Sequence, residues 1–298
     1  MSVLDRFVVA SLPLIPRFVV RKVADPYIAG ETLDDAMRVV RELNQKGFMA
    51  TVDVLGEFVA ERERAEASAA EYLVLLDRLA REKLDGNVSV KLTALGMDIS
   101  PQFVRDNLRK VVEHAHKNGI FVRIDMENSP YTTETLKIYD EFRKEFNVGT
   151  VLQAYMRRSS DDVKNLVAGG KTNFRLCKGI YVEPEDIAFK DREEVRDNFT
   201  ALLDQMFAAG VYVGIATHDE VLVKRAEKLI AKHKLGREQY EFQMLLGVLP
   251  NLRDSILARG HRLRVYVPYG EAWYGYSTRR LKENPKMAGY VFKAMFGF

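Results

Sequence analysis

Charged side chains at the ends of short apolar runs are the first candidates for chemistry in this sequence. Lys91 and Lys178 each follow such a run, where a lysine can form a Schiff base with a carbonyl compound or bind an anionic group. Asp125 comes directly after the apolar run 121–124. His218 has no second histidine or carboxylate at metal-ligand spacing, so we interpret it as a hydrogen-bonding group and predict no metal site. Together these residues predict a polar site for a substrate or a cofactor.

The stretch after the last apolar run combines aromatic and basic residues. We predict that it becomes helical at Tyr276 and ends at Pro285, with Arg279, Arg280 and Glu283 on the same face as Tyr276. One interpretation of these residues is an exposed Arg–Glu ion pair, which would add little to stability. Two adjacent arginines with a glutamate one turn later fit a clamp for a carboxylate better, because guanidinium groups bind carboxylates through paired hydrogen bonds.

Eight units of helix, glycine and short apolar run would position these side chains. Strands that alternate with helices pair in parallel through right-handed crossovers. Eight such units favour a closed (βα)8 barrel of the TIM type over an open sheet, and active sites of such barrels lie where the strands end. The glycines are Gly47, Gly86, Gly119, Gly149, Gly170, Gly210, Gly236 and Gly260, and the predicted strands lie within 48–54, 88–92, 120–124, 150–154, 173–177, 211–215, 241–244 and 263–267.

A single domain is predicted to hold all 298 residues. We expect a helical N-terminal arm over 1–46, the barrel with a substrate-binding C-terminal helix over 47–285, and an apolar tail over 286–298. The tail could contact a bilayer surface, or pack against the barrel or another subunit. No proline-rich or low-complexity linker interrupts the chain, which argues against a second domain.

Composition narrows the class of protein further. Hydrophobic residues make up 47% and charged residues 29%, as in ordinary globular proteins. A net charge of +3 without a basic run argues against a nucleic-acid partner. The one cysteine, Cys177, excludes an intramolecular disulfide framework and is expected to be an inert core thiol. The sequence shows no membrane span, no signal peptide and no G-x-G-x-x-G fingerprint, so we expect a cytoplasmic protein without a Rossmann site.

Several motifs, taken together, resemble the flavin-dependent proline dehydrogenases, most closely the short monofunctional bacterial type. The resemblance covers the chain from about residue 30 to residue 285. Motifs that occur in the same order at sensible spacing are far more specific than any one of them. They are Lys91-Leu-Thr93, Arg123-Ile-Asp-Met-Glu127, Arg175-Leu-Cys-Lys-Gly-Ile-Tyr181, Ala216-Thr-His218, Glu241-Phe-Gln243 and Tyr276-x-x-Arg-Arg-x-x-Glu283.

The resemblance implies an activity, a cofactor and partners. The protein would bind FAD non-covalently and oxidise L-proline to Δ1-pyrroline-5-carboxylate, the first step of proline catabolism to glutamate. Electrons would pass to a membrane quinone, so a cytoplasmic protein would work peripherally at the inner face of the cell membrane. A separate pyrroline-5-carboxylate dehydrogenase would be a candidate partner.

The same resemblance implies a role for particular residues. Asp125 and Arg175 would be catalytic, with Arg175 facing the flavin and favouring its anionic reduced form. The substrate-binding residues would be Lys91, Tyr266, Tyr276, Arg279, Arg280 and Glu283. The flavin contacts would be Met126, Gln153, Lys178, Gly179, Ile180, Thr217 and His218.

Two other classes remain open from the residues alone. A class I aldolase-type barrel would form a Schiff base on Lys178 or Lys91. A non-catalytic barrel would serve as a binding scaffold and hold no flavin. Borohydride trapping on a lysine would favour the first, and absence of flavin without stabilisation by proline analogues would favour the second. A visible flavin spectrum would favour the dehydrogenase.

Overall fold

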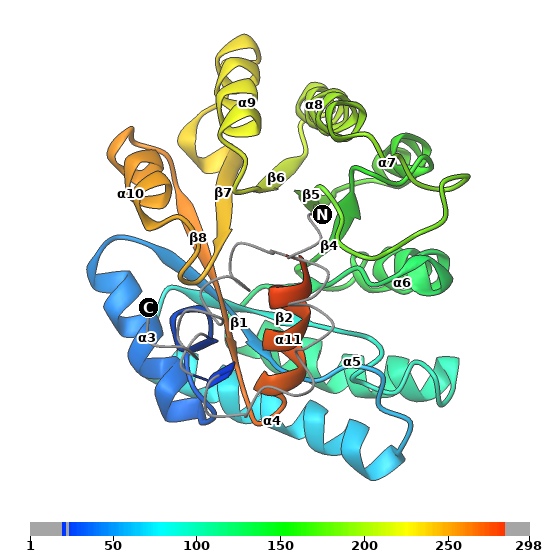
Figure 1. The fold of residues 1–298 in the computed structure, drawn as a ribbon. Coiled ribbons are helices and arrows are strands. Elements are labelled where there is room, and N and C mark those ends of the chain that lie inside the picture. Colours follow the sequence, from blue (N-terminus) through cyan, green and yellow to red (C-terminus); the bar gives the residue numbers. More distant parts are fainter. Residues whose placement is uncertain (1–19, 22–23, 284–298) are drawn as a thin grey trace.

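Eight parallel strands close into a barrel in chain order, with helices around its outside (Figure 1). The computed structural model describes residues 20–21 and 24–283, and residues 279–283 by their backbone alone. Strand β8 pairs with β1, from Met49 opposite Arg264 onward, which closes the ring. The predicted (βα)8 fold is confirmed. The strands are β1 (Met49–Val54), β2 (Gly86–Val90), β3 (Val122–Ile124), β4 (Val148–Gln153), β5 (Asn173–Cys177), β6 (Tyr212–Ala216), β7 (Tyr240–Leu245) and β8 (Leu263–Tyr269).

A helix follows each strand, and the local sequence explains where these helices begin. Ser100 Oγ accepts a hydrogen bond of 3.1 Å from Phe103 N, and Pro101 opens the first turn of α5. Asp161 lies in the first turn of α7, where an acid is favoured by the helix dipole. The helices on the barrel wall are α4 (Arg62–Arg81), α5 (Pro101–Lys117), α6 (Ser129–Phe142), α7 (Ser159–Ala168), α8 (Arg192–Ala208), α9 (Glu220–Lys232) and α10 (Pro250–Ala258), and two short 3-10 helices are η2 (Asp25–Tyr27) and η3 (Arg237–Gln239).

Two of the predicted glycines lie inside strands instead of before them. Gly86 is the first residue of β2, and Gly149 is the second residue of β4. A Cβ atom at Gly149 would lie 2.5 Å from Arg123 Nη1. Gly149 therefore makes room for a buried arginine of the neighbouring strand.

Helix α3 (Leu33–Gln45) lies in the barrel wall, although its residues were expected in an N-terminal arm. It packs against β8 and β1, at the seam where the ring closes (Figure 1). Met37 and Val40 on its inner face are fully buried. Gly47, with φ of +84°, follows this helix in the left-handed conformation that glycine adopts without strain.

The last helix, α11 (Trp273–Glu283), differs from the wall helices. It begins three residues before the predicted start at Tyr276, and it crosses one end of the barrel (Figure 1). Its Tyr276 is buried and packs with Leu55, which follows β1. The helix therefore lies over the carboxyl ends of the strands. Among the described residues, no helix is long and apolar enough to span a membrane.

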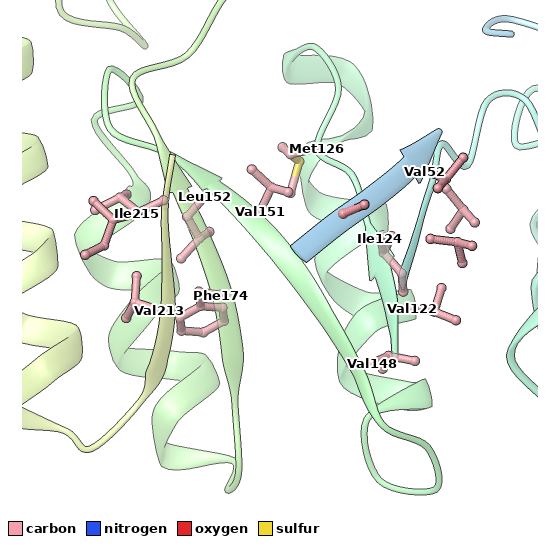
Figure 2. Close-up of a cluster of buried hydrophobic side chains, with 14 of the residues drawn as sticks. Val52, Val122, Ile124, Met126, Val148, Val151, Leu152, Phe174, Val213 and Ile215 are labelled. Atoms are coloured by element: carbon pink, nitrogen blue, oxygen red, sulfur yellow. The ribbon is translucent and has the colours of Figure 1, made fainter. Parts of the chain in front are cut away.

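An apolar shell fills the space between the strands and the wall helices. Alternate residues of a strand point to opposite faces, so each strand contributes to this shell at every second position. Leu152 and Leu176, which are register partners on β4 and β5, are both buried there. Figure 2 shows part of the shell, including Phe174 and Val213. We call this region the outer shell.

The inside of the barrel is polar where many barrels of this type hold branched apolar residues. Charged and polar side chains, most of them buried, meet there from seven of the eight strands or the residue directly after them. We call this set the interior network. It consists of Asp53, Ser89, Lys91, Asp125, Arg175, Tyr212, Glu241, Gln243, Arg264 and Tyr266.

Candidate active site

A cavity of about 250 Å³ opens above the interior network, at the carboxyl ends of the strands and beneath α11. Most of the predicted site residues line it. We call it the mouth cavity. The predicted residues in its wall are Lys91, Asp125, Met126, Gln153, Arg175, Lys178, Gly179, Ile180, His218, Tyr266 and Tyr276.

Of the predicted residues whose side chains the structure describes, only Thr217 does not line the mouth cavity. Thr217 is buried beside it and faces a neighbouring cavity. Arg279, Arg280 and Glu283 belong to α11, but their side chains lie outside the described residues.

The floor of the mouth cavity centres on an ion pair between Arg175 and Asp125. Arg175 Nη1 lies 2.5 Å from Asp125 Oδ1, and Ser89 Oγ donates to the same oxygen at 2.5 Å. Tyr266 donates to Asp125 Oδ2 at 3.1 Å, and its ring lies under the Arg175 guanidinium. Although burial favours the neutral acid, the charges of Arg175 and Lys91 hold the pKa of Asp125 below its usual value. Asp125 is therefore a fixed negative charge.

Lys91 is held by a carboxylate that the sequence analysis missed. Its Nζ lies 2.8 Å from both carboxylate oxygens of Asp53, which is fully buried. The Tyr266 hydroxyl lies 3.5 Å from Lys91 Nζ and donates to Asp125, so it links the two charged groups. Burial lowers the pKa of a lysine, but Asp53 and Asp125 outweigh it and raise the pKa of Lys91. Lys91 is therefore an ammonium group.

A sequence signal for Asp53 did exist. It lies between two valines at the end of the apolar run 48–54, where a carboxylate needs a partner because burial without one is costly. Ser89 and Glu57 were also missed as site residues: Ser89 binds Asp125, and Glu57 lines the mouth cavity. Gln243, which the sequence analysis names only within a motif, binds Arg175.

The loop after β5 needs a glycine beside the mouth cavity. Gly179 has φ of +106°, and a Cβ atom there would lie 2.2 Å from the Tyr155 ring. Tyr155 N donates to Lys178 O at 2.8 Å, which fixes the loop against β4. Cys177, expected in the core, is half-buried: it packs against the apolar core and also lines the mouth cavity. Burial raises the pKa of its thiol to about 11, so it is a neutral group.

A second cavity of about 470 Å³ adjoins the first and shares Lys178, Ala216 and His218 with it. We call it the rim cavity. Arg192, Arg196 and Lys178 bring positive charge to its wall around Asp219. Burial favours the neutral acid, but Arg196 and Lys178 lower the pKa of Asp219 to about 2.

Backbone contacts fix the two predicted residues at the junction of the cavities. His218 Nε2 accepts a hydrogen bond of 2.9 Å from Leu245 N, so a neutral His218 ring carries its proton on Nδ1. Thr217 N donates to Gln243 O at 3.2 Å, and Thr217 Oγ1 accepts from Asp219 N at 3.1 Å. The arrangement provides an apolar cavity with a charged floor that continues into a cationic one.

Comparison with known proteins gives one consistent result. The family model described as proline dehydrogenase matches residues 36–292. Proline dehydrogenase 1 of Bacillus subtilis subsp. natto is 37% identical over 270 residues, which cover 90% of this chain and 89% of that protein. The proline dehydrogenase of Deinococcus radiodurans is 33% identical over 278 residues, covering 91% and 89% of the two chains.

A solved structure agrees with these relatives. Proline utilization A (PutA) from Bdellovibrio bacteriovorus, inactivated by N-propargylglycine, superposes with a TM-score of 0.85 at 28% identity. The match covers 94% of this chain and 36% of that longer chain. Because the family model and curated relatives span most of its length, this chain belongs to the proline dehydrogenase family.

Proposed function

We propose that this chain binds FAD non-covalently, oxidises L-proline to Δ1-pyrroline-5-carboxylate and passes the electrons to a membrane quinone. The observation that supports this best is the mouth cavity, with Lys91, Asp125 and Arg175 fixed at the floor of mainly apolar walls. A small amphoteric substrate and a flat apolar ring with polar edges both suit such a cavity.

The donor set of the two cavities fits the flavin nucleotide. Met126, Val151 and Met244 offer apolar contacts for a ring system in the mouth cavity. Arg175 and Lys178 offer positive charge beside them. The rim cavity adds Arg192 and Arg196, groups suited to phosphates. The ring would lie in the mouth cavity and the phosphates toward the rim cavity.

The residues of the chain would bind and orient, while bound FAD would supply the chemistry by accepting a hydride from C5 of proline. Arg175 would face the flavin, where its positive charge favours negative charge developing on the ring. Lys91 and Asp125 would form the charged floor of the proline site, with Tyr266 between them. Tyr276 would cover the site from α11, and Arg279 and Arg280 would bind the proline carboxylate with Glu283 as their partner. Holding the carboxylate would fix where C5 lies.

A Schiff-base mechanism fits the two lysines poorly. Such a mechanism needs a neutral amine as nucleophile. Lys91 is bound to both oxygens of Asp53, and Lys178 Nζ lies 3.3 Å from Asp219 Oδ2. Each lysine amine is therefore engaged by a carboxylate, which favours oxidation by a bound cofactor over the aldolase alternative.

The proposed partners follow from the reaction. Reduced flavin must be reoxidised, and a membrane quinone would require contact with the inner face of the cell membrane. Residues 286–298 are apolar in sequence and are our candidate for that contact, but they lie outside the described residues. A separate dehydrogenase would consume the product.

An absorbance spectrum tests the proposed function. We expect protein incubated with FAD and then freed of excess nucleotide to show the visible bands of oxidised flavin, and L-proline to bleach them without oxygen. Adding a short-chain quinone should restore the bands. Protein that retains no flavin, or flavin that L-proline does not bleach, would overturn the proposal. Borohydride trapping of a carbonyl compound on Lys178 would then favour the aldolase alternative.

A further inference from the structure

A chain of hydrogen bonds runs from Arg175 into the barrel, away from the mouth cavity. Arg175 Nε donates to Gln243 Oε1 at 2.6 Å, and Gln243 Nε2 donates to Glu241 Oε1 at 2.6 Å. Glu241 and Gln243 are two residues apart on β7, so both side chains point into the barrel. All three side chains are buried. Glu241 does not line the mouth cavity, and among the described side chains it is Gln243 that links it to Arg175.

Glu241 is a fixed anchor for this chain. Arg264 Nε donates to Glu241 Oε1 at 2.7 Å, and the Tyr212 hydroxyl donates to Glu241 Oε2 at 2.9 Å. Burial favours the neutral acid, but the charge and hydrogen bond of Arg264 lower the pKa of Glu241 to about 2. Glu241 is therefore a carboxylate, which can only accept hydrogen bonds.

This acceptor determines which way the Gln243 amide points. An amide has one oxygen that accepts and one nitrogen that donates. The nitrogen must face the Glu241 carboxylate, so the oxygen must face Arg175 Nε, which only donates. A reversed amide would set donor against donor at Arg175 and acceptor against acceptor at Glu241.

The neighbouring strand leaves space for this one amide position. A Cβ atom at Gly214 on β6 would lie 2.4 Å from Gln243 Nε2 and 2.8 Å from its Cδ. Gly214 does not have a positive φ, so an alanine there would be compatible with its backbone. The glycine is therefore needed for the Gln243 side chain.

We propose that Glu241 is a positioning residue that acts through Gln243 to fix the guanidinium plane of Arg175. Asp125 holds Nη1 at 2.5 Å and Gln243 holds Nε at 2.6 Å, so the planar group is fixed at two points. The inference rests on the proposed function, in which Arg175 faces the flavin. It assigns the orientation of that arginine to Gln243 and, behind it, to Glu241, which would contact neither flavin nor substrate.

The first test needs no flavin. The Nε–H resonance of Arg175, assigned by its loss in Arg175→Lys, should be visible by NMR in the apoprotein and should exchange slowly with water. Gln243→Met removes the acceptor, and Gly214→Ala displaces it without removing any polar group. Both should speed the exchange by about tenfold or more, because a hydrogen bond to a charged group is lost. Gln205→Met is the matched control, since Gln205 joins α8 to Ser160 of α7, away from the cavities.

The second test uses the holoenzyme. Gln243→Met and Gly214→Ala should shift the midpoint potential of bound flavin to more negative values, because a loosened cation stabilises reduced flavin less. They should lower kcat with L-proline about tenfold while changing KM less, whereas Gln205→Met should match wild type. Glu241→Gln should act in the same direction, but it leaves Arg264 without its charge partner. The two variants that keep Glu241 therefore decide the result.

The outcomes separate this inference from the proposed function. The proposed positioning of Arg175 through Gln243 would be overturned, even in a protein that oxidises proline, by either of two results. One is a wild-type Arg175 Nε–H signal that exchanges as fast as an exposed one, and the other is an exchange rate that Gln243→Met leaves unchanged. Slow exchange that Gln243→Met and Gly214→Ala accelerate would support the positioning even in a protein without flavin. Unchanged potential and kcat in both variants of a proline-oxidising holoenzyme would also overturn it.

Discussion

The outer shell and the interior network are the two faces of the same eight strands, and they differ in what holds them together. In the outer shell, residues such as Phe174 and Ile215 are buried among other apolar side chains and need only volume and shape. In the interior network, Asp53 and Arg175 are just as buried but depend on particular partners at hydrogen-bond distance. In such a barrel interior a side chain cannot be replaced by another of similar volume, because each charge has a fixed place and partner.

The difference teaches where function and stability can be separated. A change in the outer shell should cost stability through lost contacts and leave the cavity floor as it is. A change in the interior network should cost stability and also alter the charges that face the mouth cavity, because a buried group left without its partner is costly.

The largest expected effect comes from Asp53→Asn in the interior network. It removes the carboxylate of the buried Lys91 pair, so we expect the free energy of unfolding to fall by about 3–5 kcal/mol, measured by urea denaturation. Asp204→Asn is the control, because Asp204 pairs with Lys232 on the surface, and it should cost at most about 1 kcal/mol. Equal losses in the two variants would show that the Asp53–Lys91 pair is no more important than a surface pair.

The matching change in the outer shell is Phe174→Ala. Phe174 is fully buried, so its loss should cost about 3–5 kcal/mol of stability through the cavity left behind. Per folded molecule, kcat/KM with L-proline should stay at the wild-type value at a temperature where the variant is folded. A large loss of kcat/KM with unchanged KM for folded protein would mean that the shell also sets the geometry of the site.

Sequence reasoning succeeded where the signal is local. Parallel strands covered on both faces read as apolar runs, so the runs ending near Val54, Cys177 and Ala216 marked β1, β5 and β6. The rule that barrel sites lie at strand ends then led to Lys91 and Asp125. Both features can be read within a few residues of each position.

The missed features depend on which distant residues meet. Asp53 and Lys91 are 38 residues apart, and their contact follows from the register of β1 against β2, which no local pattern encodes. The place of α3 in the wall was missed for the same reason. Its apolar face predicts that the helix is buried, but not which strands it packs against. Glu241 reaches the site through a side-chain amide, which spacing alone cannot show.

Helix α11 belongs to neither region, because it lies over the mouth cavity at the end of the barrel. Arg280→Met should lower kcat/KM with L-proline about tenfold or more, because the proposed charge-assisted contact with the carboxylate would be lost. Arg280→Lys should not restore the rate, since an ammonium group cannot form the paired contact. Stability and bound FAD should be unchanged. Normal turnover by both Arg279→Met and Arg280→Met would rule out the carboxylate clamp.

The two regions should also differ in how their stability responds to acid. The pKa of Glu241 is about 2 in the fold against an ordinary 4.5, so its contribution to stability is full above pH 4.5 and is lost as pH falls toward 2. Each such proton adds a slope of about 1.4 kcal/mol per pH unit to the unfolding free energy in that window. Glu241→Gln should make this slope shallower. Phe174→Ala should lower the unfolding free energy equally at every pH and leave the slope unchanged. An equal slope in wild type and Glu241→Gln would show that Glu241 is not ionised through Arg264.

The rate at which L-proline bleaches bound flavin, followed by stopped-flow absorbance without oxygen, tests the central claim most directly. The claim is that the interior network, and not the barrel packing around it, makes the site. Wild type and Phe174→Ala loaded with FAD should bleach at the same rate, and Asp53→Asn should bleach at least about tenfold more slowly at saturating proline. Flavin that proline does not bleach in any of the three, or equal rates in Asp53→Asn and Phe174→Ala, would contradict the account.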